Sequence, residues 1–270
     1  MKYIDAKTQD SLKQGVMEFL NLSVGEMTHI FISIYEDTEK EPCEWVRDFI
    51  SDYVVNENLD YIQMFHLSRR LNGTDIYVNN NLKKLLLEES PLSDFFNKHK
   101  VTFGLNERQI DLYYRGELQT IDNEFRYNGE NIYYLRSRLG HNQIQDFCVN
   151  GFAFRSYLEK NYYFKALSYC PELVENIGRY LDIRNMSTDY YNNSKYYCME
   201  YLIPMKDVIF DMGYPPQTVR EKTVEFLCQA ILRLYDEWRG SSFVSDENLI
   251  LRLADDDCIN PEWVIAAEEL

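Results

Sequence analysis

Two side chains that could hold a nucleotide, His66 and Ser68, stand at the end of an apolar run that reads as a β-strand over residues 59–66. Positions i and i+2 of a strand project from the same face, so the pair should point the same way. An imidazole carries a donor and an acceptor at opposite ends and suits a ribose hydroxyl, while a serine hydroxyl suits a carboxamide. The functional interpretation of this pair is part of a nicotinamide-nucleotide site. The alternative is a half-buried histidine at a strand end, bonded to a carbonyl.

A single acid, Glu200, lies within a second strand candidate, residues 196–203, which ends at Pro204. A carboxylate among apolar neighbours is costly to bury unless it is hydrogen-bonded or has a function. Gripping a ribose 2′-hydroxyl and stabilising an oxocarbenium-like centre would be such a function. The alternative is simple strand alternation, with Glu200 facing solvent and its two neighbours facing inward.

Arginines provide candidate contacts to phosphate. Arg69 and Arg70 follow the His-x-Ser run directly, and Arg115 follows Tyr113 closely on another strand candidate. A guanidinium group binds a pyrophosphate in bidentate fashion. We expect Arg69 and Arg115, with Tyr113 beside them, to contact a bound nucleotide. The alternative is that these are ordinary surface arginines.

Charge is distributed unevenly along the 270 residues, whose net charge is −16. Counted from the sequence, residues 1–65 carry −8, residues 66–140 carry +1 and residues 141–270 carry −9. Such an acidic chain is unsuited to broad nucleic-acid binding, which requires a cationic surface. The neutral segment that begins at His66 is where an anionic dinucleotide would bind. A stretch of this length can also differ from the rest by sampling alone.

Cysteine usage and hydropathy bound the class of protein. The six cysteines are widely spaced, without a C-x-x-C pair or a nearby histidine, which predicts reduced thiols and no structural metal. No stretch approaches the roughly 18 apolar residues of a membrane span. The first residues lack the basic start and apolar run of a secretion signal. We therefore expect a soluble, cytoplasmic protein without a membrane partner.

The pattern of elements predicts an α+β fold with a short-stranded, mainly antiparallel split sheet and flanking helices. Expected helices cover 9–22, 219–239 and the segments that begin at Pro42, Leu82, Pro91 and Pro171. Expected strands cover 28–35, 59–66, 101–103, 110–114, 196–203 and 208–210, the last pairing with 196–203. Asn128-Gly129 predicts a hairpin between 125–127 and 132–135. The acidic C-terminal residues are expected to form a solvated tail around one short helix.

Three motifs occur in a familiar order: His66-x-Ser68, Asn81-Leu82-x-x-Leu85-Leu86, and Glu200-x-Leu-Ile-Pro. This order resembles the ADP-ribosyltransferase fold, and most closely the DNA-targeting ADP-ribosyltransferase toxins. The resemblance implies that His66 and Ser68 hold the nicotinamide end of NAD and that Glu200 is the catalytic glutamate. It also implies that Arg69 or Arg115 meets phosphate.

The resemblance further implies a domain at 59–210, preceded by a helix and strand extension at 1–58 and followed by a helical segment with an acidic tail at 211–270. The expected activity is NAD-dependent transfer of ADP-ribose to a protein or nucleic acid, with Glu200 and His66 catalytic and NAD as substrate. Such a protein would act as a toxin or phage-defence effector, and a cognate inhibitor protein would be a further partner. The alternative is a non-enzymatic acidic protein, such as an antitoxin, immunity or anti-defence factor, that occludes a basic partner.

Overall fold

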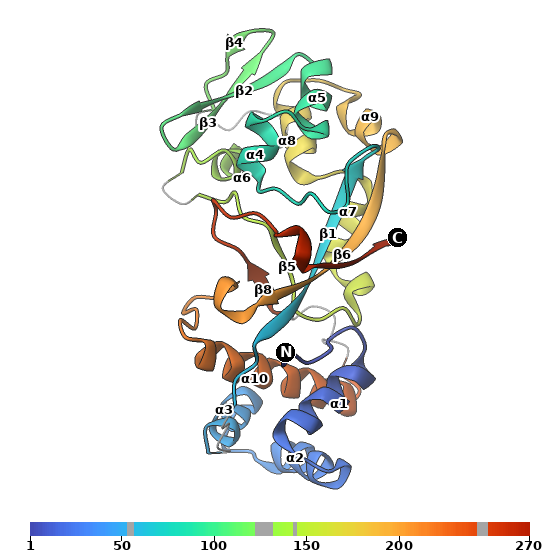
Figure 1. Cartoon of the computed structure of the whole chain (residues 1–270), viewed down its shortest axis with the longest axis vertical. Helices are drawn as coiled ribbons and strands as arrows, with labels where there is room; N and C mark the ends of the chain where they lie inside the picture. The colour runs from blue at the N-terminus through green and yellow to red at the C-terminus, as the bar shows by residue number, and fades with distance from the viewer. Residues whose placement is uncertain (53–56, 122–131, 143–144, 242–247) are drawn as a thin grey trace. The chain divides into compact units, whose positions relative to one another are not determined.

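A computed structural model describes residues 1–52, 57–121, 132–142, 145–241 and 248–270 (Figure 1). The fold is α+β, with a six-stranded, mainly antiparallel sheet in the order β7-β8-β5-β1-β6-β9 and a three-stranded sheet in the order β2-β3-β4. This confirms the expected fold class and the antiparallel character of the sheet.

The chain forms two compact units, each assembled from several segments. Unit 1 contains residues 1–65, 150–162 and 200–252, and unit 2 contains residues 66–149, 163–199 and 253–270. Two long strands, β1 (Tyr61–Leu71) and β6 (Ser194–Pro204), contribute one half to each unit. Each compact unit is made of three separate stretches of the sequence. The predicted domain boundaries at residues 58 and 210 therefore stay a prediction.

Unit 1 includes four long helices: α1 (Gln9–Leu20), α2 (Val24–Glu36), α3 (Pro42–Asp52) and α10 (Val219–Trp238). Three of them begin at side-chain caps, at Thr8, Ser23 and Thr218, each of which accepts a hydrogen bond from a backbone N–H of the first turn. Helix α10 packs against α1 and α3 (Figure 1). Its buried side chains include Phe226, Leu227, Ile231 and Leu234. The predicted helices at 9–22, after Pro42 and at 219–239 are confirmed.

Residues 28–35 form part of α2, so the strand predicted there is wrong. The capping box of Ser23 and Glu26 starts the helix before the apolar run begins. The four buried side chains then recur at helical spacing: Met27, Ile30, Phe31 and Ile34. A nearly continuous apolar run hides this period, because the polar positions that would reveal it are few.

The strands confined to unit 1 are β5 (Asn150–Phe152), β7 (Ile209–Phe210) and β8 (Ile250–Arg252). Strand β8 lies between the other two, and both pairings are antiparallel. The expected pairing of 208–210 with 196–203 is therefore wrong, since β7 instead pairs with β8, some forty residues further along the chain. Short 3₁₀ turns at Leu158–Lys160 and Met205–Asp207 complete the unit.

Unit 2 contains the meander of β2 (Val101–Asn106), β3 (Gln109–Tyr114) and β4 (Glu117–Leu118). Its helices are α4 (Leu82–Leu87), α5 (Pro91–Lys98), α6 (Ile132–Arg138), α8 (Glu172–Tyr180) and α9 (Met186–Asn192), with α7 (Tyr162–Tyr169) beginning at its boundary. These elements surround one core to which β3, α5, α6 and α8 all contribute side chains. The expected helices at Leu82, Pro91 and Pro171 and the strands at 101–103 and 110–114 are confirmed.

Two further expectations are corrected in this part of the chain. Residues 132–135 are helical in α6 and not a hairpin strand, while the predicted turn at 128–129 lies outside the described residues. The acidic C-terminal stretch is more than a solvated tail, because it includes β8, a 3₁₀ turn at Pro261–Trp263 and strand β9 (Val264–Glu269). Strand β9 is the neighbour of β6, and the Leu270 N–H donates to the Tyr196 carbonyl. Sheet pairing of this kind is invisible in local composition.

Within the described ranges, no helix is long and apolar enough to cross a membrane. The same ranges contain no cluster of three His, Cys, Asp or Glu side chains that could hold a metal ion.

Candidate functional site

A pocket of about 170 Å³ lies in unit 2 and is bordered by the unit 2 half of β1. Its walls come from β1, from the 74–80 segment that follows it, from α4, α5, α6 and α9, and from residues 148–149. The polar part of the wall includes His66, Ser68, Arg70 and Arg138, and the apolar part includes Leu82, Leu85, Leu92 and Val149. His66 and Ser68 thus line the same pocket, as their i, i+2 spacing on a strand predicts.

The size of the pocket limits what it can hold. A cavity of about 150 Å³ is known to accept a benzene molecule, whereas whole drug-sized ligands occupy pockets of about 300–1,000 Å³. At about 170 Å³ the pocket is the size of one six-membered ring. It can enclose one end of a dinucleotide but not the entire molecule.

Arg69 borders the pocket but is committed to the protein. Its guanidinium group donates to the carbonyl oxygens of Ser168 at 2.6 Å, Tyr191 at 3.0 Å and Ser194 at 3.0 Å. Its Nε donates to the Ser194 hydroxyl at 2.9 Å, and the group stacks 4.3 Å from the centre of the Tyr191 ring. A guanidinium group has five N–H donors, and four hydrogen bonds to protein atoms leave little for a ligand. Arg69 therefore ties β1 to α7 and to the start of β6.

Arg70 and Arg138 have donors to spare. Arg70 contacts the Asn79 side-chain oxygen through Nη2 and the Asp75 carbonyl at 3.4 Å through Nη1. Arg138 forms an ion pair with Asp146 at 2.9 Å through Nη1. In both arginines the Nε–H is buried and has no hydrogen-bond partner within the described structure. Such a donor costs free energy unless a ligand or solvent molecule satisfies it.

The pocket is electropositive, although the chain as a whole is acidic. Three arginines line it, and no aspartate or glutamate is among its lining residues. Burial by itself lowers the pKa of Arg138, but its interactions with Tyr134 and Asp146 outweigh this effect and leave the pKa raised. Arg138 therefore remains charged, and the local field favours an anion.

Tyr190 closes one side of the pocket as a fixed donor. Its hydroxyl donates to the Arg69 carbonyl at 2.8 Å. Burial raises the pKa of Tyr190, so its hydroxyl stays neutral across the physiological range.

Asn81, the head of the predicted motif helix, acts as the N-cap of α4. Its side-chain oxygen accepts from the Lys84 N–H at 2.9 Å, and its amide nitrogen donates to the Asp255 carbonyl at 3.0 Å. The helix thus begins at the predicted residue, and the Asn81 side chain is engaged with backbone on both sides.

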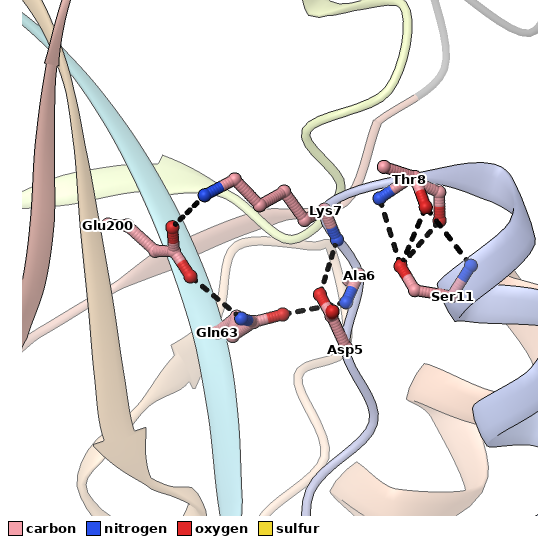
Figure 2. Close-up of polar contacts among 7 residues, drawn as sticks. All are labelled: Asp5, Ala6, Lys7, Thr8, Ser11, Gln63 and Glu200. Atoms are coloured by element: carbon pink, nitrogen blue, oxygen red, sulfur yellow. Dashed lines mark hydrogen bonds and ion pairs between the residues drawn. The ribbon is translucent and has the colours of Figure 1, made fainter.

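Glu200 belongs to the unit 1 half of β6 and is not among the residues that line the pocket of unit 2. It is only 7% exposed, so the expected alternative of a solvent-facing acid is wrong. Figure 2 shows its carboxylate between two donors: Gln63 Nε2 lies 2.9 Å from Oε1, and Lys7 Nζ lies 3.0 Å from Oε2. The acid is buried because both of its oxygens are satisfied by the protein.

The N-terminal segment completes this network. Gln63 on β1 accepts the Ala6 N–H through Oε1 at 2.6 Å, which fixes its amide so that Nε2 faces Glu200 (Figure 2). The chain then enters α1 at once through the Thr8 and Ser11 capping box. Because Ala6 and Lys7 both bond to the sheet, Glu200 holds the N-terminal segment of unit 1 in place.

Arg115 and Tyr113 lie on the three-stranded sheet and do not line the pocket. Arg115 follows β3 in the left-handed backbone conformation, with φ at 54°, and its side chain is exposed and 5.0 Å from the centre of the Tyr114 ring. Tyr113 pairs with Thr102 on β2, and its ring lies against Gly104.

Arg70 is one of the arginines that the sequence offered as a phosphate contact, although the expectation fell on Arg69 and Arg115. Arg70 continues the i, i+2, i+4 alternation of His66 and Ser68, so the strand period favours it over Arg69. Arg138 was not a candidate. Arg138 reaches the pocket from the last residue of α6, and no local pattern connects it to β1.

Comparison with models of known protein families, with curated proteins and with solved structures finds no match for this chain.

Proposed function

We propose that the chain binds NAD at the pocket of unit 2 and transfers ADP-ribose to a macromolecule. The supporting observation is that His66, Ser68 and arginine side chains line one pocket whose volume suits a six-membered ring. Arginine side chains at the wall of the pocket also suit the phosphate groups that adjoin the nicotinamide riboside. The resemblance of the motif order to the ADP-ribosyltransferases supports the same proposal.

The proposed reaction breaks the bond between the ribose C1′ and the nicotinamide nitrogen. The bonding electron pair leaves with the ring nitrogen, and the cationic ribose is captured by a lone pair of the target, which then loses a proton. Catalysis of this step requires a placed carboxylate, because positive charge develops at the ribose in the transition state. Glu200 is proposed for that role on the resemblance alone, since in the structure Gln63 and Lys7 bond its two oxygens and it does not line the pocket.

The test of NAD binding uses labelled NAD, a cell extract as the source of target, and variants of the pocket. We expect nicotinamide release by the wild-type chain, and Ser68→Ala to weaken NAD binding about tenfold through loss of one hydrogen bond. His66→Gln should weaken binding similarly. His99→Gln is the matched control, because His99 lies in unit 2 near Asp189 and does not line the pocket. Absence of both NAD binding and nicotinamide release would overturn the proposal.

The role of Glu200 is tested separately from binding. Glu200→Gln should abolish nicotinamide release while leaving NAD affinity largely unchanged. Lys7→Met removes one of the two donors that orient the carboxylate but keeps the carboxylate itself, so it should lower nicotinamide release without abolishing it. Full activity of Glu200→Gln would remove Glu200 from the mechanism and leave the binding proposal standing.

The net charge of −16 favours a second candidate, a non-enzymatic protein that occludes a basic partner. This candidate predicts no nicotinamide release under any condition. It predicts instead a complex with a basic protein whose affinity falls steeply as salt is added.

A further inference from the structure

We infer that Arg70 and Arg138 form an oxyanion subsite in the unit 2 pocket, which takes a phosphate or carboxylate group of a small ligand. The two arginines come from different elements, β1 and α6, and both line this pocket. This inference does not depend on NAD chemistry, because it concerns the charge of the group that binds.

The first supporting observation is a shortage of acceptors. Each of the two guanidinium groups keeps a buried Nε–H without a partner within the described structure. The remaining contacts of Arg70 are to an amide oxygen and a carbonyl, so no carboxylate neutralises it in the described ranges. A buried guanidinium N–H that has no acceptor is stabilised by an oxyanion, which accepts charge-assisted hydrogen bonds.

The second observation is the charge balance of the wall. Arg69, Arg70 and Arg138 line the pocket without any lining aspartate or glutamate. Asp146 compensates Arg138, and the carbonyl partners of Arg69 are neutral. An excess of positive charge therefore remains beside a cavity of about 170 Å³, in a protein whose net charge is −16.

The third observation concerns the shape of the ligand. Leu82, Leu85, Leu92 and Val149 supply an apolar wall to the same cavity. Apolar walls with a few placed polar groups are typical of sites for small organic ligands. A free inorganic ion would leave this wall uncovered, whereas an anionic group carried on one planar ring would cover it.

The test is a titration of the wild-type chain with three probes at constant ionic strength: inorganic phosphate, nicotinate and nicotinamide. Nicotinate and nicotinamide share one shape and differ in charge. The readout is the side-chain Nε–H resonances of Arg70 and Arg138 in heteronuclear NMR spectra, which shift when the group donates to an oxyanion. We expect saturable shifts with phosphate or nicotinate and none at these resonances with nicotinamide. Phosphate alone would assign the subsite to phosphate groups, and tighter binding of nicotinate would assign it to a ring carboxylate.

Variants confirm the residues. Arg70→Gln should lower the affinity for the anion about tenfold. Arg138→Lys should lower it similarly, although the lysine keeps a cation beside Asp146. Arg115→Gln removes an exposed arginine outside the pocket and should leave affinity unchanged. The inference would be overturned if the wild type showed no saturable shifts. It would also be overturned if Arg70→Gln and Arg138→Lys bound the anion as tightly as the control variant Arg115→Gln. NAD turnover is not a readout, so failure of the NAD proposal and failure of the subsite are distinguished.

Discussion

The ion pair between Lys7 and Glu200 gives the sharpest prediction about stability, because the two side chains differ in solvent exposure. The Glu200 side chain is 9% exposed and that of Lys7 is 50% exposed. Lys7→Met leaves a nearly buried carboxylate with Gln63 as its remaining donor in the described network. Glu200→Gln leaves a neutral amide that still accepts from Gln63, while Lys7 can turn to solvent. The lysine substitution should therefore be the more destabilising of the two.

The magnitudes follow from the burial of each group. Losing the ammonium partner of a buried carboxylate costs up to about 3–5 kcal/mol, and partial hydration at the open Lys7 side reduces this to about 2 kcal/mol. Replacing the carboxylate by an amide exchanges one half-exposed ion pair for a neutral hydrogen bond, a loss of about 1 kcal/mol. The double variant needs no counter-charge and should lose about 1.5 kcal/mol, well below the sum of the single losses.

The assay is urea denaturation of the wild type, the two single variants and the double variant, followed by circular dichroism. Lys40→Met is the matched control, because the Lys40–Asp48 pair is exposed on both sides and its loss should change stability little. Strict additivity of Lys7→Met and Glu200→Gln would refute the reasoning. So would a Lys7→Met variant as stable as Lys40→Met.

Three further perturbations test other parts of the fold. A Cβ on Gly151 would lie 2.8 Å from a backbone carbonyl oxygen of β1, so Gly151→Ala should lower the unfolding free energy by about 2–3 kcal/mol. Gly25 lies in the open first turn of α2, and Gly25→Ala should instead raise the melting temperature. A lysine at position 69 cannot form all of the hydrogen bonds that Arg69 donates to three carbonyls, so Arg69→Lys should lower the unfolding free energy by about 2 kcal/mol. Arg115→Lys should leave the thermal stability unchanged. Burial raises the pKa of the Cys170 thiol from 9.0 to about 12, so its contribution to stability is complete below pH 9 and is lost as pH rises toward 12. Over that window the wild type should lose about 1.4 kcal/mol per pH unit more than Cys170→Ala, and equal slopes would contradict the burial of the thiol.

The division of labour between Arg69 and Arg70 shows how a fold decides among similar residues. The two are adjacent in sequence and chemically identical, so composition gives no reason to prefer either. Strand alternation places them on opposite faces. Arg69 meets the backbone carbonyls of Ser168, Tyr191 and Ser194 and becomes a structural cross-link. Arg70 shares the face of His66 and Ser68 and keeps a donor available.

Helix starts were the part of the fold most readable from sequence. Asn81, Ser90 and Thr218 each cap the helix that the residue pattern predicted, because a cap is a hydrogen bond between groups two or three residues apart. Residues 28–35 failed for the opposite reason. The Ser23 cap lay upstream of the apolar run, and an unbroken run fits a buried strand as well as a buried helix.

By itself, the sequence determined what depends on near neighbours: the caps, the helices that follow them, and the shared face of His66 and Ser68. Tertiary structure alone decided what Glu200 bonds to, which carbonyls engage Arg69, and that Arg138 of α6 lines the same pocket as β1. The physical reason is distance along the chain. Lys7 and Glu200 are 193 residues apart, and a hydrogen bond between them exists only after the sheet and the N-terminal segment have packed together. Local sequence patterns cannot predict this contact, because the free energy that brings the two residues together comes from burial of the whole unit.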